Sequence, residues 1–316
     1  MIWADLSRSL SALGCGAYTE ARAGRRRKRA HGESGKATYM GKRMDFRNRW
    51  VLVTGASGGL GRELARQLAR EHGANLLLLA RRKDRLEELR TELERAAGVK
   101  VIPLVADLSQ ARDVERVLAE ILAGPPVYAA ILNAAVTHFG PQEQLAAATF
   151  EAMLSTNVSS VVRFSTALIP RIVNEQPGGG IMFVASMAGL QPVPYQSAYS
   201  GTKAFVIHFA CGLWHELRKK PISITTFAPG GIVTEMTAGD SFAPLSGWLM
   251  PAEQCAREGL AAFRRRDYLY VSGFSNRFGI GLGRLLPRRF VTALVARTYR
   301  RALEATGKPA ALPGSE

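Results

Sequence analysis

Short apolar segments alternate along the chain with longer segments in which apolar and polar residues recur with a helical period. The apolar runs have the length of strands and cover residues 50–53, 75–80, 101–106, 127–132, 181–185, 222–228 and 268–271. Continuous apolar runs of this length are typical of strands buried on both faces. Between the first two runs, Leu60, Leu64 and Leu68 recur every four residues, as on one face of a helix. The alternation predicts an α/β fold: a doubly wound, Rossmann-like parallel sheet with helices on both faces.

Positive charge is concentrated at the two ends of the chain. The formal net charge is +16, of which residues 1–43 carry +7 and residues 255–316 carry +8. The run Arg25–Arg29 lies among Gly, Ala and Ser, which is typical of a disordered segment. Residues 1–43 could contact anionic lipid or nucleic-acid phosphates. Alternatively, Met40 or Met44 is the true start, and these residues have no folded role.

The C-terminal region predicts a basic amphipathic helix over residues 287–303. One face carries Val291, Leu294, Val295, Tyr299 and Ala302, while Arg288, Arg289, Arg297, Arg300 and Arg301 lie largely elsewhere. Such a helix could pack on its own domain or on a second subunit, or it could lie on an anionic membrane. Gly279, Gly281 and Gly283 predict a flexible or closely packed connection before it. Residues 235–266 contain an apolar stretch that predicts a flap over the functional site.

Three glycines separate the first strand from the first helix. Gly55, Gly59 and Gly61 have the spacing G-x3-G-x-G, in the order strand, glycine turn, helix. Glycine lets the backbone approach a pyrophosphate closely, and a helix N-terminus offers unpaired N–H groups to it. The segment therefore predicts a dinucleotide-binding turn.

The residues after strand 75–80 bear on the choice of nucleotide. NAD recognition calls for an acidic residue at the end of this strand, but the strand is followed by Arg81-Arg82-Lys83, and Asp84 comes four residues beyond it. A guanidinium binds a phosphate through a fork of N–H donors. The pattern favours NADP over NAD. The alternative is a solvated basic start to the next helix.

A possible proton-transfer group lies further along the chain. Tyr199 and Lys203 are four residues apart in a helical segment, so they share a helix face, and Ser186 ends the apolar run 181–185. A neighbouring ammonium lowers the pKa of a phenol toward the working range, and a serine hydroxyl can bond the same substrate oxygen. By itself the Tyr–Lys pair is equally compatible with an exposed tyrosine beside a solvated lysine.

Together, the glycine turn preceded by Thr54 and the Ser186, Tyr199 and Lys203 group resemble the short-chain dehydrogenase/reductase family. The resemblance extends through residues 47–234. Leu132 and Ala135 depart from it, because the family usually has Asn-Asn-Ala-Gly where this chain has Leu-Asn-Ala-Ala. With the two arginines added, it implies a cofactor site made of Gly55, Ser57, Gly59, Leu60, Gly61, Arg81, Arg82, Asp107, Asn133, Tyr199, Lys203, Pro229, Gly230, Ile232 and Thr234.

The resemblance implies reversible hydride transfer between NADPH and a carbonyl. Tyr199 would donate the proton, Lys203 would lower the pKa of Tyr199 and bond the nicotinamide ribose, and Ser186 would hold the carbonyl oxygen. Asn157 would help hold a water that links Lys203 to solvent. Candidate substrate contacts are His138, Gln191 and Tyr195, with His138 alternatively a surface or loop histidine. The apolar flap favours a lipophilic ketone or acyl chain, and no metal site is expected.

We expect three regions: a basic, disordered segment 1–43, an NADP-binding catalytic Rossmann domain 44–254, and residues 255–316 as the last strand and a C-terminal helical extension of that domain. Three widely spaced cysteines fit a reducing cytoplasm, with peripheral membrane contact as an option. The expected partners are a small carbonyl or alcohol substrate and, by the resemblance, further copies in a homodimer or tetramer; specific nucleic-acid binding is not expected. The alternative functions are an NADP(H) sensor without catalysis and a membrane-surface binding protein on the same scaffold.

Overall fold

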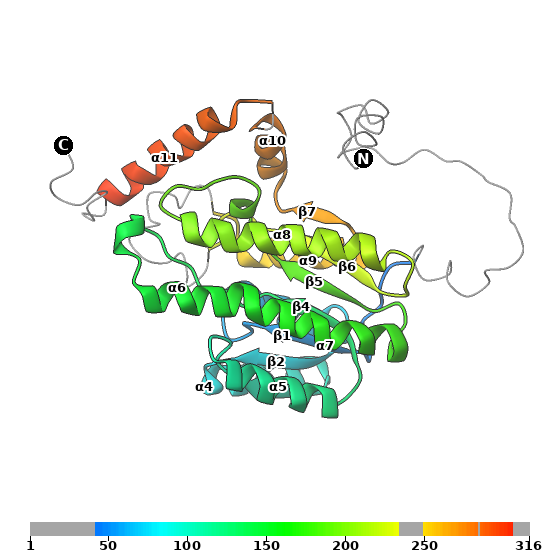
Figure 1. The fold of residues 1–316 in the computed structure, drawn as a ribbon. Coiled ribbons are helices and arrows are strands. Elements are labelled where there is room, and N and C mark those ends of the chain that lie inside the picture. The colour runs from blue at the N-terminus through cyan, green and yellow to red at the C-terminus, as the bar shows by residue number, and fades with distance from the viewer. Residues whose placement is uncertain (1–41, 234–248, 284, 306–316) are drawn as a thin grey trace, which may run out of the picture. The chain divides into compact units, whose positions relative to one another are not determined.

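A parallel β-sheet forms the centre of the molecule (Figure 1). The computed structural model describes residues 42–233, 249–283 and 285–305. Within these ranges the sheet has seven strands in the order β3-β2-β1-β4-β5-β6-β7. The strands are β1 (Trp50–Thr54), β2 (Asn75–Ala80), β3 (Val101–Val105), β4 (Val127–Leu132), β5 (Gly180–Val184), β6 (Ser223–Ala228) and β7 (Leu269–Val271). The predicted strands and the doubly wound fold are therefore confirmed.

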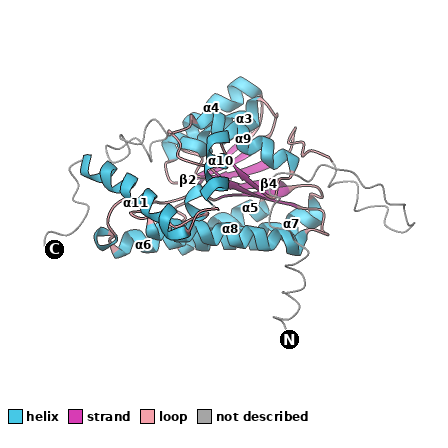
Figure 2. Cartoon of the chain, turned by 90° about the horizontal axis from the view of Figure 1, so that it is seen from above, coloured by secondary structure: helices cyan, strands magenta, loops and turns pink. Residues whose placement is uncertain are grey.

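Helices cover both faces of the sheet (Figure 2). One core contains side chains of α3 (Gly59–Arg70), α4 (Lys83–Ala97) and α9 (Ala252–Arg265). The other core contains side chains of α5 (Ala111–Ala123), α7 (Ser160–Glu175) and α8 (Ser197–Leu217). The remaining helices are α6 (Ala147–Leu154), α10 (Phe274–Gly283) and α11 (Arg288–Ala305).

Strand β1 shows why the apolar runs are continuous. Val51 and Val53 point into one core and Leu52 into the other, so each position needs an apolar residue. Strand β1 pairs with β2 on one side and with β4 on the other, and the chain order reverses there. In open α/β sheets, ligands bind at the carboxyl ends of the strands beside such a reversal. The fold therefore places the glycine turn, which follows β1, at the expected ligand crevice.

Two expectations for the C-terminal half differ from the structure. Residues 252–265 are not part of a flap: they form α9, which packs against α3 and buries Cys255, Leu260 and Phe263. Residues 234–248, the rest of the predicted flap, lie outside the described residues. The glycine-containing segment 279–283 is not a loop either, because it belongs to helix α10. The predicted helix over 287–303 is confirmed as α11.

Candidate active site

The side chains of Ser186, Tyr199 and Lys203 meet at the carboxyl end of β5. Tyr199 and Lys203 lie in the first two turns of α8, and the Lys203 ammonium is 5.8 Å from the centroid of the Tyr199 ring. Ser186 lies two residues beyond the end of β5, bonds the Tyr199 hydroxyl and accepts a hydrogen bond from the Ala188 N–H at 3.1 Å. The three residues that the sequence singled out are therefore one group in space.

Lys203 is buried, at 3% exposure, although its side chain carries an ammonium group. The Nζ atom donates a hydrogen bond of 2.9 Å to the carbonyl oxygen of Val184 at the end of β5. Burial lowers the pKa of Lys203 to about 8, because a low-dielectric environment disfavours the charged amine. A buried lysine whose pKa lies near neutrality is unusual for a purely structural residue and marks a candidate functional site.

The pKa of Tyr199 departs from the ordinary value in the opposite direction from the one expected. Burial raises it to about 12, the bond from Ser186 lowers it, and the nearby Tyr299 of α11 raises it. Lys203, which was expected to lower this pKa, is not among the causes, and its ammonium donates to the Val184 carbonyl instead. The phenol is therefore protonated at neutral pH, which is the form that donates a proton.

Asn157 lies in a turn of π-helix, Ser155–Ser159, between α6 and α7. Its amide oxygen accepts from the Val136 N–H, and its amide nitrogen donates to the Val136 carbonyl and to Thr202 Oγ1, all within 3.0 Å. Both amide protons are thus used. The side chain ties the loop after β4 to α8 beside Lys203, so in this structure it positions other groups. Turns of π-helix often occur at functional sites.

The glycine turn leaves no space for side chains. Gly55 has φ +70°, and a Cβ atom on Gly61 would lie 2.3 Å from the Gly55 carbonyl oxygen. Helix α3 begins at Gly59, and its N-cap Gly58 makes no side-chain capping bond. No N-cap side chain covers the backbone N–H groups of this helix end, which is compatible with the anion site that the sequence predicts there. Leu60 is buried in the core behind the turn and Ser57 lies within it.

Asn133 and Thr54 hold the turn in place. Thr54 Oγ1 accepts from the N–H groups of Asn133 and Ala134, and the Asn133 amide donates to the Thr54 carbonyl at 3.0 Å. These bonds join the ends of β1 and β4 across the crevice. Asn133 was predicted to contact cofactor, and the bonds show it supporting the turn that would make the contact.

The two arginines after β2 contact different residues. Arg82 reaches the glycine turn, where its guanidinium donates to Ser57 Oγ and to the Ser57 carbonyl, each at 3.1 Å. Arg81 is exposed, and its Nη1 lies 3.9 Å from an oxygen of Asp107, which follows β3. Arg82 and Ser57 thus place a guanidinium and a hydroxyl beside the turn. That donor set fits the 2′-phosphate of NADP(H).

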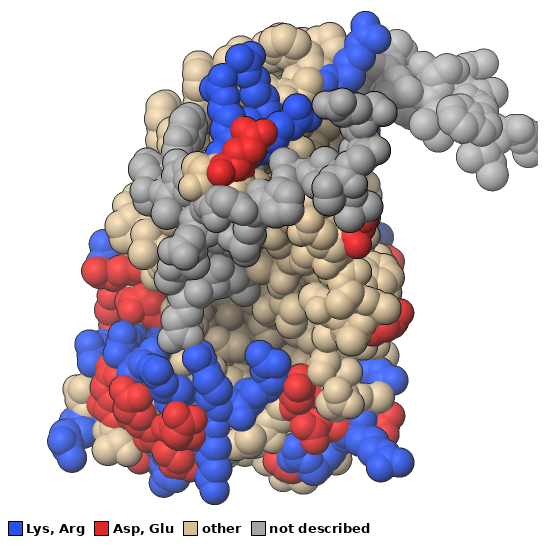
Figure 3. All heavy atoms as spheres, turned by 90° about the vertical axis from the view of Figure 1, so that its left-hand side faces the viewer, with Lys and Arg blue, Asp and Glu red and all other residues tan. Residues whose placement is uncertain are grey.

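The loop after β6 completes the rim. The Pro229 carbonyl accepts from Met187, next to Ser186, and Gly230 N–H donates to Ser272. Ile232 forms a parallel bridge to Met250. Thr234 lies outside the described residues. Figure 3 views the molecule from the side on which the strands end, and it shows a hollow lined mainly by uncharged residues, with Lys and Arg along its lower edge.

Two loops bring the candidate substrate residues to one side of the site. Gly140 N–H donates to the Tyr195 carbonyl at 2.9 Å, and Tyr195 has φ +65°, a region that residues other than glycine seldom adopt. His138 Nε2 lies 3.3 Å from the Pro141 carbonyl, within its own loop. The Gln191 carbonyl accepts from Ser200 at 3.2 Å, so its backbone is tied to α8.

Helix α11 also contacts the site, which the sequence did not predict. Tyr299 packs edge-on against Phe139 with ring centroids 5.4 Å apart, and it acts on the pKa of Tyr199. Arg300, the next residue, donates to the Tyr195 hydroxyl at 3.2 Å. The helical period had placed Tyr299 on the apolar face of this helix, but no sequence pattern indicates what that face covers.

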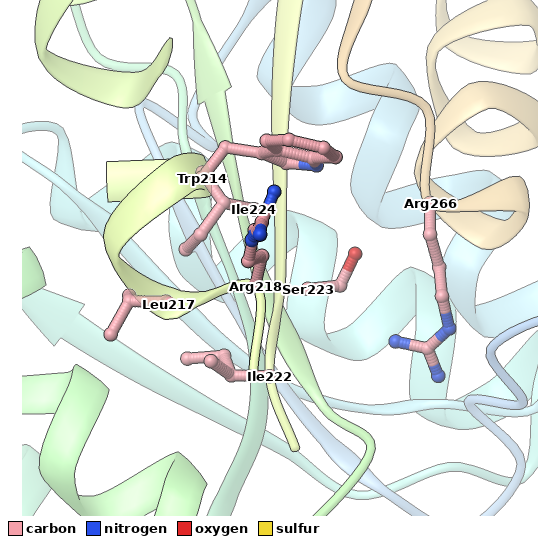
Figure 4. A pocket seen from close by; sticks show the side chains of 7 residues that line it. All are labelled: Trp214, Leu217, Arg218, Ile222, Ser223, Ile224 and Arg266. Carbon is pink, nitrogen blue, oxygen red and sulfur yellow. The ribbon is translucent and has the colours of Figure 1, made fainter. Parts of the chain in front are cut away.

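A small pocket lies at the other end of the sheet, away from these groups (Figure 4). It surrounds the amino end of β6 and is lined by Trp214, Leu217, Arg218, Ile222, Ser223, Ile224 and Arg266. The Arg266 guanidinium there bonds the Gly178 carbonyl. The pocket belongs to the packing between α8 and the sheet. Among the described residues, no cluster of His, Cys, Asp or Glu could hold a metal ion, and no helix could cross a bilayer.

The chain is similar to known proteins in sequence and in fold. The sequence model of the short chain dehydrogenases matches residues 49–242. The chain is 29% identical over 206 residues to the inactive hydroxysteroid dehydrogenase-like protein 1 of Pongo abelii, covering 65% of this chain and 62% of that protein. It is also 29% identical over 192 residues to the very-long-chain 3-oxoacyl-CoA reductase of Anas platyrhynchos, covering 60% of this chain and 61% of that protein. The match thus spans about three fifths of each relative's length.

Among solved structures, the short-chain dehydrogenase of Sphingobium yanoikuyae in complex with NADPH is similar, with a TM-score of 0.68 and 29% identity. The likeness covers 78% of this chain and 95% of that one. The family match includes the glycine turn, Ser186, Tyr199 and Lys203. With the fold and the grouping of these residues, it leads to one conclusion: the chain belongs to the short-chain dehydrogenase family and has an oxidoreductase fold.

Proposed function

We propose that the protein is an NADP(H)-dependent reductase that converts a lipophilic ketone or acyl-chain carbonyl to an alcohol, reversibly. The observation that carries this proposal is the group of Ser186, Tyr199 and Lys203 at the carboxyl end of β5, on the same edge of the parallel sheet as the glycine turn after β1. A similar solved structure is an NADPH complex, and one relative is named a 3-oxoacyl-CoA reductase. Both support the proposed cofactor and substrate class.

The proposed chemistry divides between cofactor and protein. The nicotinamide supplies the hydride that reduces the carbonyl carbon. Tyr199, protonated at neutral pH, donates its proton to the carbonyl oxygen, and the alcohol forms. Ser186, which already bonds the Tyr199 hydroxyl, supports that oxygen through a hydrogen bond. In the reverse direction the tyrosinate takes the proton back.

Lys203 stabilises the charge that develops on Tyr199 in this proposal. As Tyr199 loses its proton, a negative charge develops on the phenol oxygen, and the ammonium 5.8 Å from the ring stabilises it. Because the pKa of Lys203 is lowered to about 8, the side chain can also release and regain a proton near neutral pH. Asn157 keeps the adjoining turn of α8 in place through Thr202.

The preference for NADP(H) rests on Arg82 beside Ser57 and on the lack of an acidic residue at the end of β2. A cytoplasmic location and assembly into a homodimer or tetramer remain predictions. Peripheral contact with an anionic membrane is also proposed, and the C-terminal helices are the part of the chain that supports it.

A screen of NADPH oxidation with short, bulky and long-chain ketones and with 3-oxoacyl thioesters tests the proposal. We expect turnover with lipophilic members of the panel and weaker turnover when NADH replaces NADPH. The competing function is an NADP(H) sensor, which the inactive relative makes relevant. The sensor would be favoured by tight NADPH binding without NADPH oxidation by any carbonyl in the panel. The assay should cover pH about 6 to 9, a range that includes the pKa of Lys203.

A further inference from the structure

The two C-terminal helices carry a row of large apolar side chains that point to solvent. Phe274, Phe278 and Leu282 follow each other at spacing four on α10, and they are 77%, 65% and 51% exposed. The row continues through Leu285, Leu286, Phe290 and Leu294, which are 82%, 41%, 58% and 59% exposed. Soluble proteins usually scatter such residues singly, so seven of them between residues 274 and 294 mark a candidate interaction surface.

Helix α11 has a separate inner face that already accounts for its packing on the domain. Tyr299 contacts Phe139, and Ala302 and Leu303 are buried. Val291 and Val295 are half-buried. A helix that packs only on its own domain needs one apolar face. Packing on the domain therefore does not use the outer residues Phe290 and Leu294. The sequence predicted Leu294 on the same face as Val291 and Tyr299, but the structure places it on the exposed side of the helix.

The charge around the row is strongly positive. Residues 274–305 contain seven arginines and one acidic residue, Glu304. Within the described residues, no ion pair is formed by Arg288, Arg289, Arg297 or Arg301, which are all exposed. In Figure 3, basic side chains gather at the top of the molecule, where α11 lies. The surface thus combines Phe and Leu with unpaired guanidinium groups.

This combination selects among possible partners. A second copy paired about a twofold axis would bring the same arginines against each other, and like charges repel. Phe and Leu that enter the interfacial region, flanked by arginines at the headgroups, match an anionic bilayer.

We propose that α10 and α11 form a docking surface for a membrane that contains anionic phospholipid. The inference deepens the proposed function, because the inner face of α11 contacts the site through Tyr299, and a lipophilic carbonyl concentrates in the same bilayer. Docking through the outer face keeps the catalytic site beside the membrane surface without a spanning helix.

Co-sedimentation of the full chain with vesicles tests the surface and does not depend on turnover, so its result is separate from that of the substrate screen. The probes are phosphatidylcholine vesicles and phosphatidylcholine vesicles that contain phosphatidylserine. We expect binding to the second kind only, weakened by salt. Leu285→Ser/Phe290→Ser/Leu294→Ser should lower the vesicle affinity at least about tenfold, because it removes apolar side chains that would enter the bilayer interface. Arg288→Gln/Arg289→Gln/Arg297→Gln should also lower it at least about tenfold, because each surface arginine contributes about 1 kcal/mol.

Two control variants match these changes. Arg95→Gln/Lys100→Gln/Arg112→Gln removes three exposed charges from α4, α5 and the residue before β3, and Val105→Ser removes an exposed apolar side chain at the far edge of the sheet. Both should bind as the parent chain does. Equal loss in the charge control would show non-specific attraction and overturn the proposal. So would the absence of vesicle binding together with a dimer that the apolar variant dissociates, since the row would then serve a second copy.

Discussion

Burial determines the protonation of the two central residues of the site. It lowers the pKa of Lys203 and raises that of Tyr199, so the lysine titrates near neutrality and the phenol remains an acid. The sequence identified both residues through their spacing, because i and i+4 share a helix face. It could not show that the Val184 carbonyl accepts a hydrogen bond from the ammonium or that Tyr299 raises the pKa of the phenol, since neither residue is near in sequence.

Lys203 makes stability depend on pH in a defined window. The folded pKa is about 8 and the ordinary value is 10.5, so between these values the unfolded chain binds more protons than the folded one. The free energy of unfolding contributed by this residue therefore rises with pH through the window. The free-energy cost of burying the charged lysine is fully present below pH 8 and absent above pH 10.5.

We expect the parent chain to gain up to about 3 kcal/mol relative to Lys203→Met across that window. Urea unfolding of both proteins at intervals of pH measures the difference. A difference that stays constant with pH would show that the lysine is not buried as an amine.

Arg82 should govern the choice of nucleotide. Removing a charge-assisted bond costs about 1.5–3 kcal/mol, so Arg82→Ala should raise the KM for NADPH by about ten- to a hundredfold and leave that for NADH nearly unchanged. Arg85→Ala, one turn further along α4, is the matched control. If both variants lose NADPH and NADH affinity equally, the arginine does not read a 2′-phosphate.

At the scale of elements, the strands and the first helices follow from the sequence, because fully buried strands need apolar residues at every position. Helix α9 was assigned to a flap because the apolar residues before it suggested a single segment. Its core role depends on α3, which lies nearly two hundred residues earlier, and no local pattern reports such a contact. Helix α10 was missed for a different reason: its three glycines have low helix propensity and predict a break, and the helix buries no side chain that a core pattern could have revealed.

Two glycines that lie in helices, Gly61 and Gly212, should respond differently to substitution by alanine. In Gly61→Ala the new Cβ would lie 2.3 Å from the Gly55 carbonyl oxygen, so we expect a loss of about 2–3 kcal/mol in stability and loss of NADPH binding. Gly212 in α8 has nothing within 4 Å, so Gly212→Ala should stabilise by about 0.5–1 kcal/mol. Thermal unfolding with and without NADPH checks both. Equal behaviour of the two variants would mean that the turn is not closely packed.

Helix α11 should influence the pH dependence of catalysis through Tyr299. Burial is the main cause that raises the pKa of Tyr199, and Tyr299 adds to it. Tyr299 also packs on Phe139 in the loop after β4. We expect Tyr299→Ala to reduce the burial of the site, so the alkaline limb of the kcat profile should move to lower pH, whereas Tyr299→Phe keeps the ring and should move it less. Identical profiles for the parent and both variants would place α11 away from the site in solution.

At the scale of the whole molecule, the account joins a family fold to a C-terminal surface that the fold does not require. The sheet brings the ends of β1, β4, β5 and β6 to one side, and the residues that matter for chemistry follow these strands. The position of these residues at one edge of the sheet could be predicted from the sequence, because each motif directly follows a predicted strand of a parallel sheet. The relation of α11 to the site could not, since it depends on how the chain returns after β7.

The central claim is that Tyr199 supplies the proton while the cofactor supplies the hydride. The most direct test is single-turnover oxidation of bound NADPH by Tyr199→Phe, with the best ketone from the screen and with NADPH affinity measured separately. The account predicts unchanged NADPH binding and a rate reduced by about a thousandfold or more. Near-normal oxidation in this variant would contradict it.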